Sequence, residues 1–177
     1  MTGIATLTKQ YVDIAKPYNV MILDTRKTMP GLRFFDKYAV NVGGGTNHRS
    51  SLSAAILIKD NHLQAGNGIK QVIESINEQN KEKYIVELEV DNIDQLREGL
   101  DLNIKAFLLD NMSPDMIKNA ISIIRKQPNG DDIFVEASGG ITLDNLHQYV
   151  STGINAISVG AITHSVTAAN IHINFKK

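Results

Sequence analysis

Basic side chains are concentrated in one short segment, residues 24–49, although the net charge of the 177-residue chain is only −1. Arginine can bind a planar carboxylate through two parallel hydrogen bonds, whereas lysine acts as a point charge. Three consecutive glycines, Gly43 to Gly45, interrupt the segment. Its basic and imidazole residues are Arg26, Lys27, Arg33, Lys37, His48 and Arg49. This local surplus of positive charge indicates a site for a small substrate that carries several negative charges.

Carboxylates form a second group of candidates. Glu87 and Glu89 alternate in the sequence VELEV, so they share one face of an expected strand, and Asp110 ends the apolar run FLLD. Burying two carboxylates without partners costs free energy, and cations or a metal ion would relieve that cost. The three acids could hold sugar hydroxyls and a divalent ion such as Mg²⁺, which prefers oxygen ligands. The alternative is a solvated edge strand with no ligand.

Glycines follow two further apolar runs, in the sequences SGGI (138–141) and VGAI (159–162). Glycine lets backbone N–H groups approach an anion closely, and the N-terminus of a following helix adds a favourable dipole. Either sequence alone could be an ordinary turn. Their occurrence after two consecutive strands favours a phosphate site, because barrels often bind phosphate in the loops after their last strands.

The elements that must position these residues are clearest in the second half of the chain. Short apolar strands alternate there with amphipathic segments, a pattern typical of parallel β/α units covered on both faces. Ser113 and Pro114 provide an N-cap and a first helical residue for the helix expected up to Gln127. A second helix is expected over residues 142–153 and a third directly after Val90. The strands are expected at residues 84–90, 104–110, 133–137 and 154–160.

The first half is less regular. Helices are expected over residues 4–15 and 68–79, and strands over 20–24 and 54–60. Residues 38–42 are a further strand candidate, which brings the total to about seven. Arg33 and Lys37 are expected to be surface charges of a loop or short helix that also contains Asp36.

These elements predict an α/β fold, an incomplete TIM-barrel-like (β/α) barrel of about six to seven parallel strands. A complete eight-stranded barrel typically needs about 250 residues, more than this chain has. Nearly every polar candidate lies at the C-terminal end of an expected strand, which is the catalytic face of such a barrel. The sequence therefore predicts one polar site on one rim.

The composition excludes several classes of function. Apolar residues make up 42% of the chain and charged residues 21%, as in a soluble globular protein. The small net charge gives no reason to expect a nucleic-acid or membrane partner, and the longest apolar runs are too short to span a bilayer. There is no cysteine, which fits a reducing cytoplasm and excludes a thiol nucleophile. His147 and His172 are expected to be ordinary surface or edge residues.

Eight motifs occur in an order that resembles one known family, the quinolinate phosphoribosyltransferases, also called nicotinate-nucleotide pyrophosphorylases (carboxylating). The resemblance covers essentially the whole chain. The motifs are TGIATLT, ILDTRKTMPGLR, KYAVNVGGGTNHR, LIKDNH, VELEV, LLDNMSP, EASGGI and ISVGAITHS. The resemblance implies transfer of phosphoribosyl from phosphoribosyl pyrophosphate to quinolinate with decarboxylation. The products would be nicotinate mononucleotide, CO₂ and pyrophosphate, in de novo NAD synthesis.

The resemblance also implies roles for individual residues. Arg26, His48 and Arg49 would grip the two carboxylates of quinolinate, while Lys27 and Lys59 would support substrate and pyrophosphate. The triple glycine would then be the bend that returns His48 and Arg49 to the barrel mouth near Arg26.

The implied sugar and metal ligands are acidic. Glu89, preferred to Glu87, and Asp110 would bind the ribose hydroxyls and Mg²⁺. The residues implied to hold the 5′-phosphate are Ser138, Gly139 and Gly160. The implied catalytic residues are Lys27, Lys59, Glu89 and Asp110.

The resemblance divides the chain at its C-terminal end. Residues 1–165 would form the catalytic barrel, and residues 166–177 a strand that in the family pairs with an N-terminal domain absent from this sequence. A helix that carries a further substrate-binding arginine in the family is also cut short here. We therefore expect a truncated chain that binds substrate poorly and turns over slowly. A homodimer or larger assembly is implied, with small-molecule substrates as the other partners.

Two other functions stay open on the sequence. One is a catalytically impaired remnant that serves as a binding or assembly module. The other is a related phosphoribosyltransferase with a different substrate, although Arg26, His48 and Arg49 favour a dicarboxylate.

Overall fold

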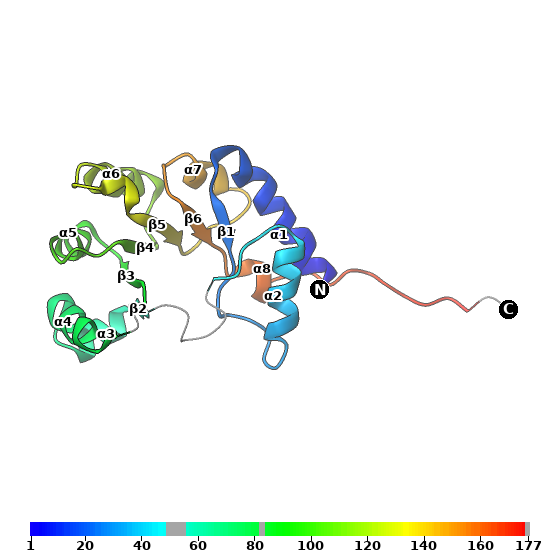
Figure 1. Cartoon of the computed structure of the whole chain (residues 1–177). Coiled ribbons are helices and arrows are strands. Elements are labelled where there is room, and N and C mark those ends of the chain that lie inside the picture. Colours follow the sequence, from blue (N-terminus) through cyan, green and yellow to red (C-terminus); the bar gives the residue numbers. More distant parts are fainter. Residues whose placement is uncertain (49–55, 82–83, 176–177) are drawn as a thin grey trace.

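Six short parallel strands form one sheet in the computed structural model, which describes residues 1–48, 56–81 and 84–175. The sheet order is β1-β6-β5-β4-β3-β2, so the first strand of the chain lies beside the last. The strands are β1 (Met21–Leu23), β2 (Ile56–Ile58), β3 (Val86–Val90), β4 (Ala106–Asp110), β5 (Phe134–Ser138) and β6 (Ala156–Ser158). Figure 1 shows them as a curved row with a gap between β1 and β2, which confirms the expected incomplete barrel.

Helices follow the strands along the outside of this curved sheet (Figure 1). Helix α1 packs against α2, α7 and β1, while α5 lies between α4 and α6. The α-helices are α1 (Thr2–Ala15), α2 (Arg33–Val42), α3 (Asp60–Ala65), α4 (Ile69–Gln79), α5 (Ile93–Asp101), α6 (Pro114–Arg125), α7 (Leu146–Val150) and α8 (Ala161–His164). Two 3₁₀ turns are η1 (Lys16–Tyr18) and η2 (Gly130–Asp132). None of the helices in the described residues is long and apolar enough to cross a membrane.

Local sequence explains where the helices of the second half begin. The Ser113 hydroxyl accepts a hydrogen bond from the backbone N–H of Met116, and Pro114 is the first residue of α6, as expected. The Asn92 side chain caps α5 in the same way. The helix expected over residues 142–153 is much shorter, because α7 contains only Leu146–Val150.

The core is formed by strand residues that are apolar on both faces of the sheet, as expected for parallel β/α units. Leu88, Phe107 and Val135 are completely buried on three neighbouring strands. Gly99 of α5 packs directly over Phe107 and Leu88, since a Cβ atom there would lie 2.7 Å from the first and 2.8 Å from the second. This close approach fixes α5 against β3 and β4.

The strand expected over residues 38–42 is wrong, because these residues belong to α2. The buried side chains of α2 show the reason: Asp36, Lys37 and Val40 recur at helical spacing on one face. Lys37 was expected to be a surface charge, and this too is wrong, because its ammonium group is buried against Asp24. Arg33 is exposed, as expected.

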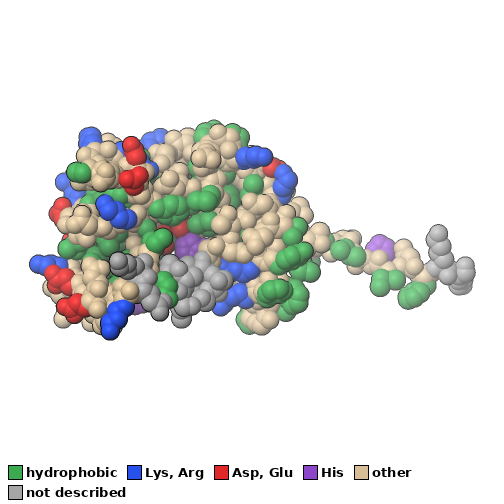
Figure 2. All heavy atoms as spheres, viewed as in Figure 1, with side chains coloured by type: hydrophobic (Ala, Val, Ile, Leu, Met, Phe, Trp, Pro, Cys, Tyr) green, Lys and Arg blue, Asp and Glu red, His purple; other side chains and the backbone are tan. Residues whose placement is uncertain are grey.

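The C-terminal tail shows neither helix nor strand over its described part, residues 166–175. It extends away from the barrel in Figure 1, and Figure 2 shows hydrophobic side chains exposed along it. Phe175, for example, is 92% exposed. Pairing of this segment with another domain stays a prediction.

The triple glycine lets the chain turn tightly against α1. Gly44 has a φ of +87°, in the region that favours glycine, and Gly43 lies so close to α1 that no side chain fits. Directly after this bend, Thr46 forms a parallel bridge with Leu23 of β1. The bend therefore leads residues 46–48 along the free edge of β1, towards the carboxyl ends of the strands.

We predict that Gly43→Ala destabilises the fold by about 1–3 kcal/mol, the usual cost of overpacking. A Cβ atom there would lie 2.6 Å from the Ala5 carbonyl oxygen and 2.7 Å from Thr8 Cβ. The matched control is Gly44→Asn, where the nearest atom lies at 3.5 Å and asparagine tolerates a positive φ. Chemical denaturation measures both, and equal losses of stability would contradict the packing argument.

Candidate active site

A cavity of about 530 Å³ opens at the carboxyl ends of the strands. It contains nine of the ten residues expected at a substrate site, and all six strands or the residues directly after them contribute to its wall. The nine residues are Arg26, Lys27, His48, Lys59, Glu89, Asp110, Ser138, Gly139 and Gly160. The tenth, Arg49, lies outside the described residues. The structure thus brings these side chains together, while their roles in binding stay predictions.

Lysine and glutamate meet on one side of the cavity. The Lys59 ammonium group, between β2 and α3, lies 2.5 Å from Oε2 of Glu89 on β3. Asp110 ends β4, and one of its carboxylate oxygens accepts a hydrogen bond from the Asn111 side chain at 2.6 Å. Glu89 and Asp110 both line the cavity, so two carboxylates suited to sugar hydroxyls or a divalent ion are available there.

Glycines after β5 and β6, next to the carboxylate of Asp110, leave backbone groups accessible in the cavity wall. Gly139 has a φ of +94°, and a Cβ atom there would lie 2.2 Å from the Asn111 side-chain oxygen. Gly160 is similarly close to His164, and Lys27 lies next to it. The Thr163 hydroxyl donates a hydrogen bond to the Lys27 carbonyl oxygen at 2.7 Å. The segment after β1 is therefore attached to the segment after β6.

The backbone of His48 is held by a buried ion pair. Lys37 on α2 donates to Oδ1 of Asp24 at 2.6 Å and to the His48 carbonyl oxygen at 2.5 Å. The backbone N–H of His48 is held as well, because it donates a hydrogen bond to Oδ1 of Asp24 at 2.8 Å. The Asn47 side chain donates to the second Asp24 oxygen at 2.6 Å. Asp24, which is completely buried, therefore fixes the position of residues 47–48.

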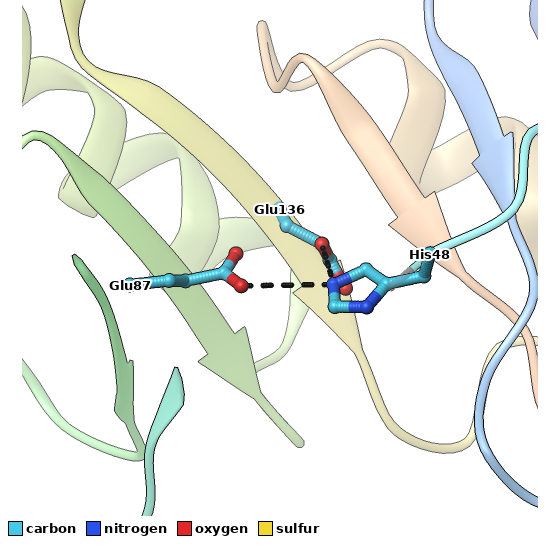
Figure 3. Close-up of side chains that lie close together, drawn as sticks. All are labelled: His48, Glu87 and Glu136. Carbon is cyan, nitrogen blue, oxygen red and sulfur yellow. Dashed lines mark ion pairs between the residues drawn. The ribbon is translucent and has the colours of Figure 1, made fainter. Parts of the chain in front are cut away.

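The imidazole ring of His48 lies between two glutamates from different strands, as Figure 3 shows. Its Nε2 atom is 3.0 Å from Oε2 of Glu136 on β5 and 3.6 Å from Oε2 of Glu87 on β3. Glu136 is completely buried, and its other oxygen accepts a hydrogen bond from the Ser158 hydroxyl. One ring nitrogen of His48 and one carboxylate oxygen from each glutamate lie within 4.8 Å of one another. Such a cluster could share a proton or hold a metal ion.

Burial by itself lowers the pKa of His48, but hydrogen bonds and attraction from Glu136 and Glu87 outweigh it and raise the pKa to about 9. Burial raises the pKa of the Glu136 carboxyl, and the nearby charge of Glu87 adds to that effect while His48 opposes it. Both shifts favour a bound proton. The cluster therefore holds at least one proton at neutral pH, and the imidazole is the group whose charged form the surroundings stabilise.

Several members of this site were not anticipated from the sequence. Asp24 and Lys37 are 13 residues apart and form a pair only through the fold. Glu136 lies within the apolar strand IFVEA, and a single acid inside an otherwise buried strand is a signal that could have identified it. Glu87 was given less weight than Glu89, yet it contacts the His48 ring.

Comparison with known proteins gives a consistent result. The family model "Quinolinate phosphoribosyl transferase, C-terminal domain" matches residues 4–174. A Nicotiana tabacum protein, quinolinate phosphoribosyltransferase [decarboxylating] 2b, mitochondrial, is 41% identical across 98% of this chain and 52% of its own length. A Bacillus subtilis protein, a probable nicotinate-nucleotide pyrophosphorylase [carboxylating], is 38% identical across 98% of this chain and 58% of its own.

A solved structure shares the same fold. The nicotinate-nucleotide pyrophosphorylase of Ehrlichia chaffeensis superposes with a TM-score of 0.86 at 40% identity, over 93% of this chain and 58% of that one. The chain thus spans between about half and three-fifths of the length of these three proteins.

We predict that the buried pair Asp24–Lys37 is sensitive to loss of one partner. Lys37→Met leaves the Asp24 charge buried without its ion pair, which typically costs about 3–5 kcal/mol of folding free energy. The double variant Asp24→Asn/Lys37→Met should recover part of that loss. The control is Lys9→Met, which removes an exposed pair with Asp13 and should cost less than about 1 kcal/mol. Urea unfolding of the four proteins measures this, and equal effects of both lysines would contradict it.

The raised pKa of His48 predicts how stability depends on pH. Because the pKa of His48 is higher in the folded than in the unfolded protein, its protonation stabilises the folded state. This stabilisation is complete below pH 6.5, the ordinary pKa of histidine, and is lost as the pH rises through about 9. The wild-type protein should therefore lose more stability between pH 7 and 10 than His48→Gln does. Thermal unfolding at several pH values measures the difference, and parallel curves would refute the shift.

Proposed function

Since the chain belongs to the quinolinate phosphoribosyltransferase family, we propose that it transfers the phosphoribosyl group of phosphoribosyl pyrophosphate to quinolinate with loss of CO₂. The products are nicotinate mononucleotide and pyrophosphate, in the biosynthesis of NAD. The observation that carries the proposal is that cations, carboxylates and glycine backbone meet in one cavity. These are the three kinds of group that a pyridine dicarboxylate, a ribose and a phosphate require.

The cations suit the pyridine dicarboxylate. Arg26 and Lys27 follow β1 and line the cavity with His48. A guanidinium group binds a carboxylate through two parallel hydrogen bonds, so Arg26 suits one carboxylate, and His48 suits the other as a donor. Arg49 completes this set in the proposal.

The glycine-rich side suits the 5′-phosphate of the sugar. Ser138 offers a hydroxyl, while Gly139 and Gly160 leave backbone close to the cavity without side chains in the way. Backbone N–H groups and the neighbouring Lys27 ammonium group suit a doubly charged oxyanion.

The carboxylates suit the reacting sugar. Attack of the pyridine nitrogen on C1 as pyrophosphate leaves develops positive charge on the ribose, which Glu89 and Asp110 would stabilise. The oxygen ligands of these two residues also fit Mg²⁺, which when bound supplies charge neutralisation for the leaving pyrophosphate. Lys59, paired with Glu89, holds that carboxylate in place and offers a cation to the same leaving group. The positive charge on the nitrogen stabilises the carbanion left on the adjacent ring carbon when the carboxylate departs as CO₂, and a proton from water then completes the C–H bond of the product.

The proposal includes a homodimer or larger assembly in a cytoplasmic compartment. Apolar side chains are exposed on α2, including Phe34 and Val42, and such surface commonly lies in an interface. The absence of cysteine fits a reducing compartment.

We predict that quinolinate binds the chain more tightly than nicotinate, because two carboxylates find partners in the cavity. Arg26→Met should weaken quinolinate binding at least about tenfold, the loss expected when a charge-assisted contact is removed. Phosphoribosyl pyrophosphate binding should change much less. Isothermal titration calorimetry measures all three ligands, and Arg97→Met, on the exposed side of α5, is the control.

The outcomes separate the proposal from its alternatives. Equal binding of nicotinate and quinolinate would refute the dicarboxylate site. Binding of phosphoribosyl pyrophosphate alone would indicate a related phosphoribosyltransferase with another substrate. Binding of neither would favour a catalytically impaired module.

A further inference from the structure

The two glutamates that contact His48 have no task in the reaction proposed above. They come from β3 and β5, and both carboxylates reach the same ring nitrogen, Nε2 (Figure 3). Neither faces the bulk solvent, because Glu87 and Glu136 are both buried. Two buried acids beside one imidazole need a physical reason, since each would otherwise destabilise the fold.

The hydrogen-bonding capacity of Glu136 explains why its carboxylate lies beside the His48 ring. Its Oε1 atom accepts a hydrogen bond from the Ser158 hydroxyl. Its Oε2 atom is buried without a hydrogen-bond partner among the described residues, and the nearest cationic group is Nε2 of His48, 3.0 Å away. An ionised carboxylate only accepts hydrogen bonds, so this contact is favourable when Nε2 carries a proton.

The position of the His48 ring determines which of its two nitrogens is available to a ligand. The His48 backbone is held by Asp24 and Lys37, which fixes where the side chain starts, while the contacts of Nε2 with Glu136 and Glu87 orient the ring itself. The second ring nitrogen, Nδ1, points away from both carboxylates in Figure 3. In the part of the chain that the structure describes, Nδ1 makes no hydrogen bond, and His48 lines the cavity. A proton on Nδ1 would therefore be available to a ligand.

We infer that Glu136, assisted by Glu87, is a positioning residue that keeps His48 protonated on Nε2 and positively charged. The Nδ1–H group is then offered permanently to an anionic group in the cavity. The identity of that group, a carboxylate of a pyridine dicarboxylate, rests on the function proposed above. The positive charge of His48 is thus stabilised by Glu136, a buried residue of the cavity wall, and by Glu87, before any ligand binds.

The charged groups around His48 support this assignment. Glu136 and Glu87 face the ring itself, whereas Asp24 and Lys37 face its backbone and largely neutralise each other at 2.6 Å. The cations that share the cavity, Arg26, Lys27 and Lys59, oppose protonation, and Lys59 is already paired with Glu89. Attraction by the two glutamates nevertheless raises the pKa of His48 to about 9.

A metal ion is the competing occupant of the same three side chains. It would require Nε2 without its proton, and it would release that proton on binding. The 3.0 Å contact between Nε2 and Oε2 of Glu136 is already a hydrogen-bonding distance, and Ser158 occupies the other oxygen of that carboxylate. The structure therefore favours a proton.

Nitrogen-15 NMR of the histidine rings in the full chain tests the inference directly. The chain has five histidines, and His48→Gln identifies the His48 signals. We expect wild-type His48 to remain protonated on both nitrogens at pH 7.5. Glu136→Gln should lower its pKa by at least about one unit, a tenfold loss of proton affinity. Glu87→Gln, whose carboxylate is farther away, should lower it less, and the exposed control Glu98→Gln should leave it unchanged.

Ligand binding supplies the second readout. Between pH 6 and 9 the wild-type affinity for quinolinate should fall only about twofold, whereas the affinity of Glu136→Gln, with the pKa of His48 lowered by about one unit, should fall about tenfold. Phosphoribosyl pyrophosphate binding should be equal in both proteins. A purely structural role of Glu136 would not produce this selective pH dependence.

Several results would overturn the inference. A wild-type His48 pKa of 6.5 or below would do so, and this measurement holds even if Glu136→Gln does not fold. A larger shift in Glu87→Gln than in Glu136→Gln would reassign the role. Loss of the His48 proton on addition of micromolar Zn²⁺ would show a metal site instead. If quinolinate binds no variant, the proposed function fails, while the NMR titration still decides the protonation of His48.

Discussion

The buried carboxylate of Asp24 is the constraint on which the site depends. It lies directly after β1 with no access to solvent, so the fold must supply donors to both of its oxygens. Lys37 comes from α2, Asn47 and the His48 N–H come from the segment after the triple glycine, and all three converge on it. One acid therefore connects the first strand, the first long loop and the second helix, and it determines where His48 can lie.

The parallel sheet explains why residues far apart in sequence meet. All six strands run in the same direction, so the residues that follow them are delivered to one rim even though the strands themselves are only three to five residues long. Pairs of strands contribute three kinds of group there: cations after β1 and β2, carboxylates on β3 and β4, and small residues after β5 and β6. This distribution is what would allow one cavity to bind the dicarboxylate, the sugar and the phosphate of the proposed reaction.

The sequence predicts the fold and most of this rim, because both depend on local patterns. Apolar strands, the Ser113 cap and polar residues after strands can all be read from a few consecutive residues. The pairs Asp24–Lys37 and His48–Glu136 cannot, because they join residues brought together only by the curved sheet and the glycine bend. The wrong assignment of residues 38–42 has the same origin: five residues fit a short strand as well as a helix, and only the contacts of α2 distinguish them.

The buried pairs also change how the positive charge of residues 24–49 is understood. Lys37 is neutralised inside the fold by Asp24, and the His48 ring is compensated by Glu136 and Glu87. Among the described residues, only Arg26 and Lys27 of that segment line the cavity without an ion pair to an acid. Much of the local charge therefore serves to hold the donors in place before any ligand arrives. A substrate that enters such a cavity meets fixed donors, and less of its binding free energy is spent on ordering them.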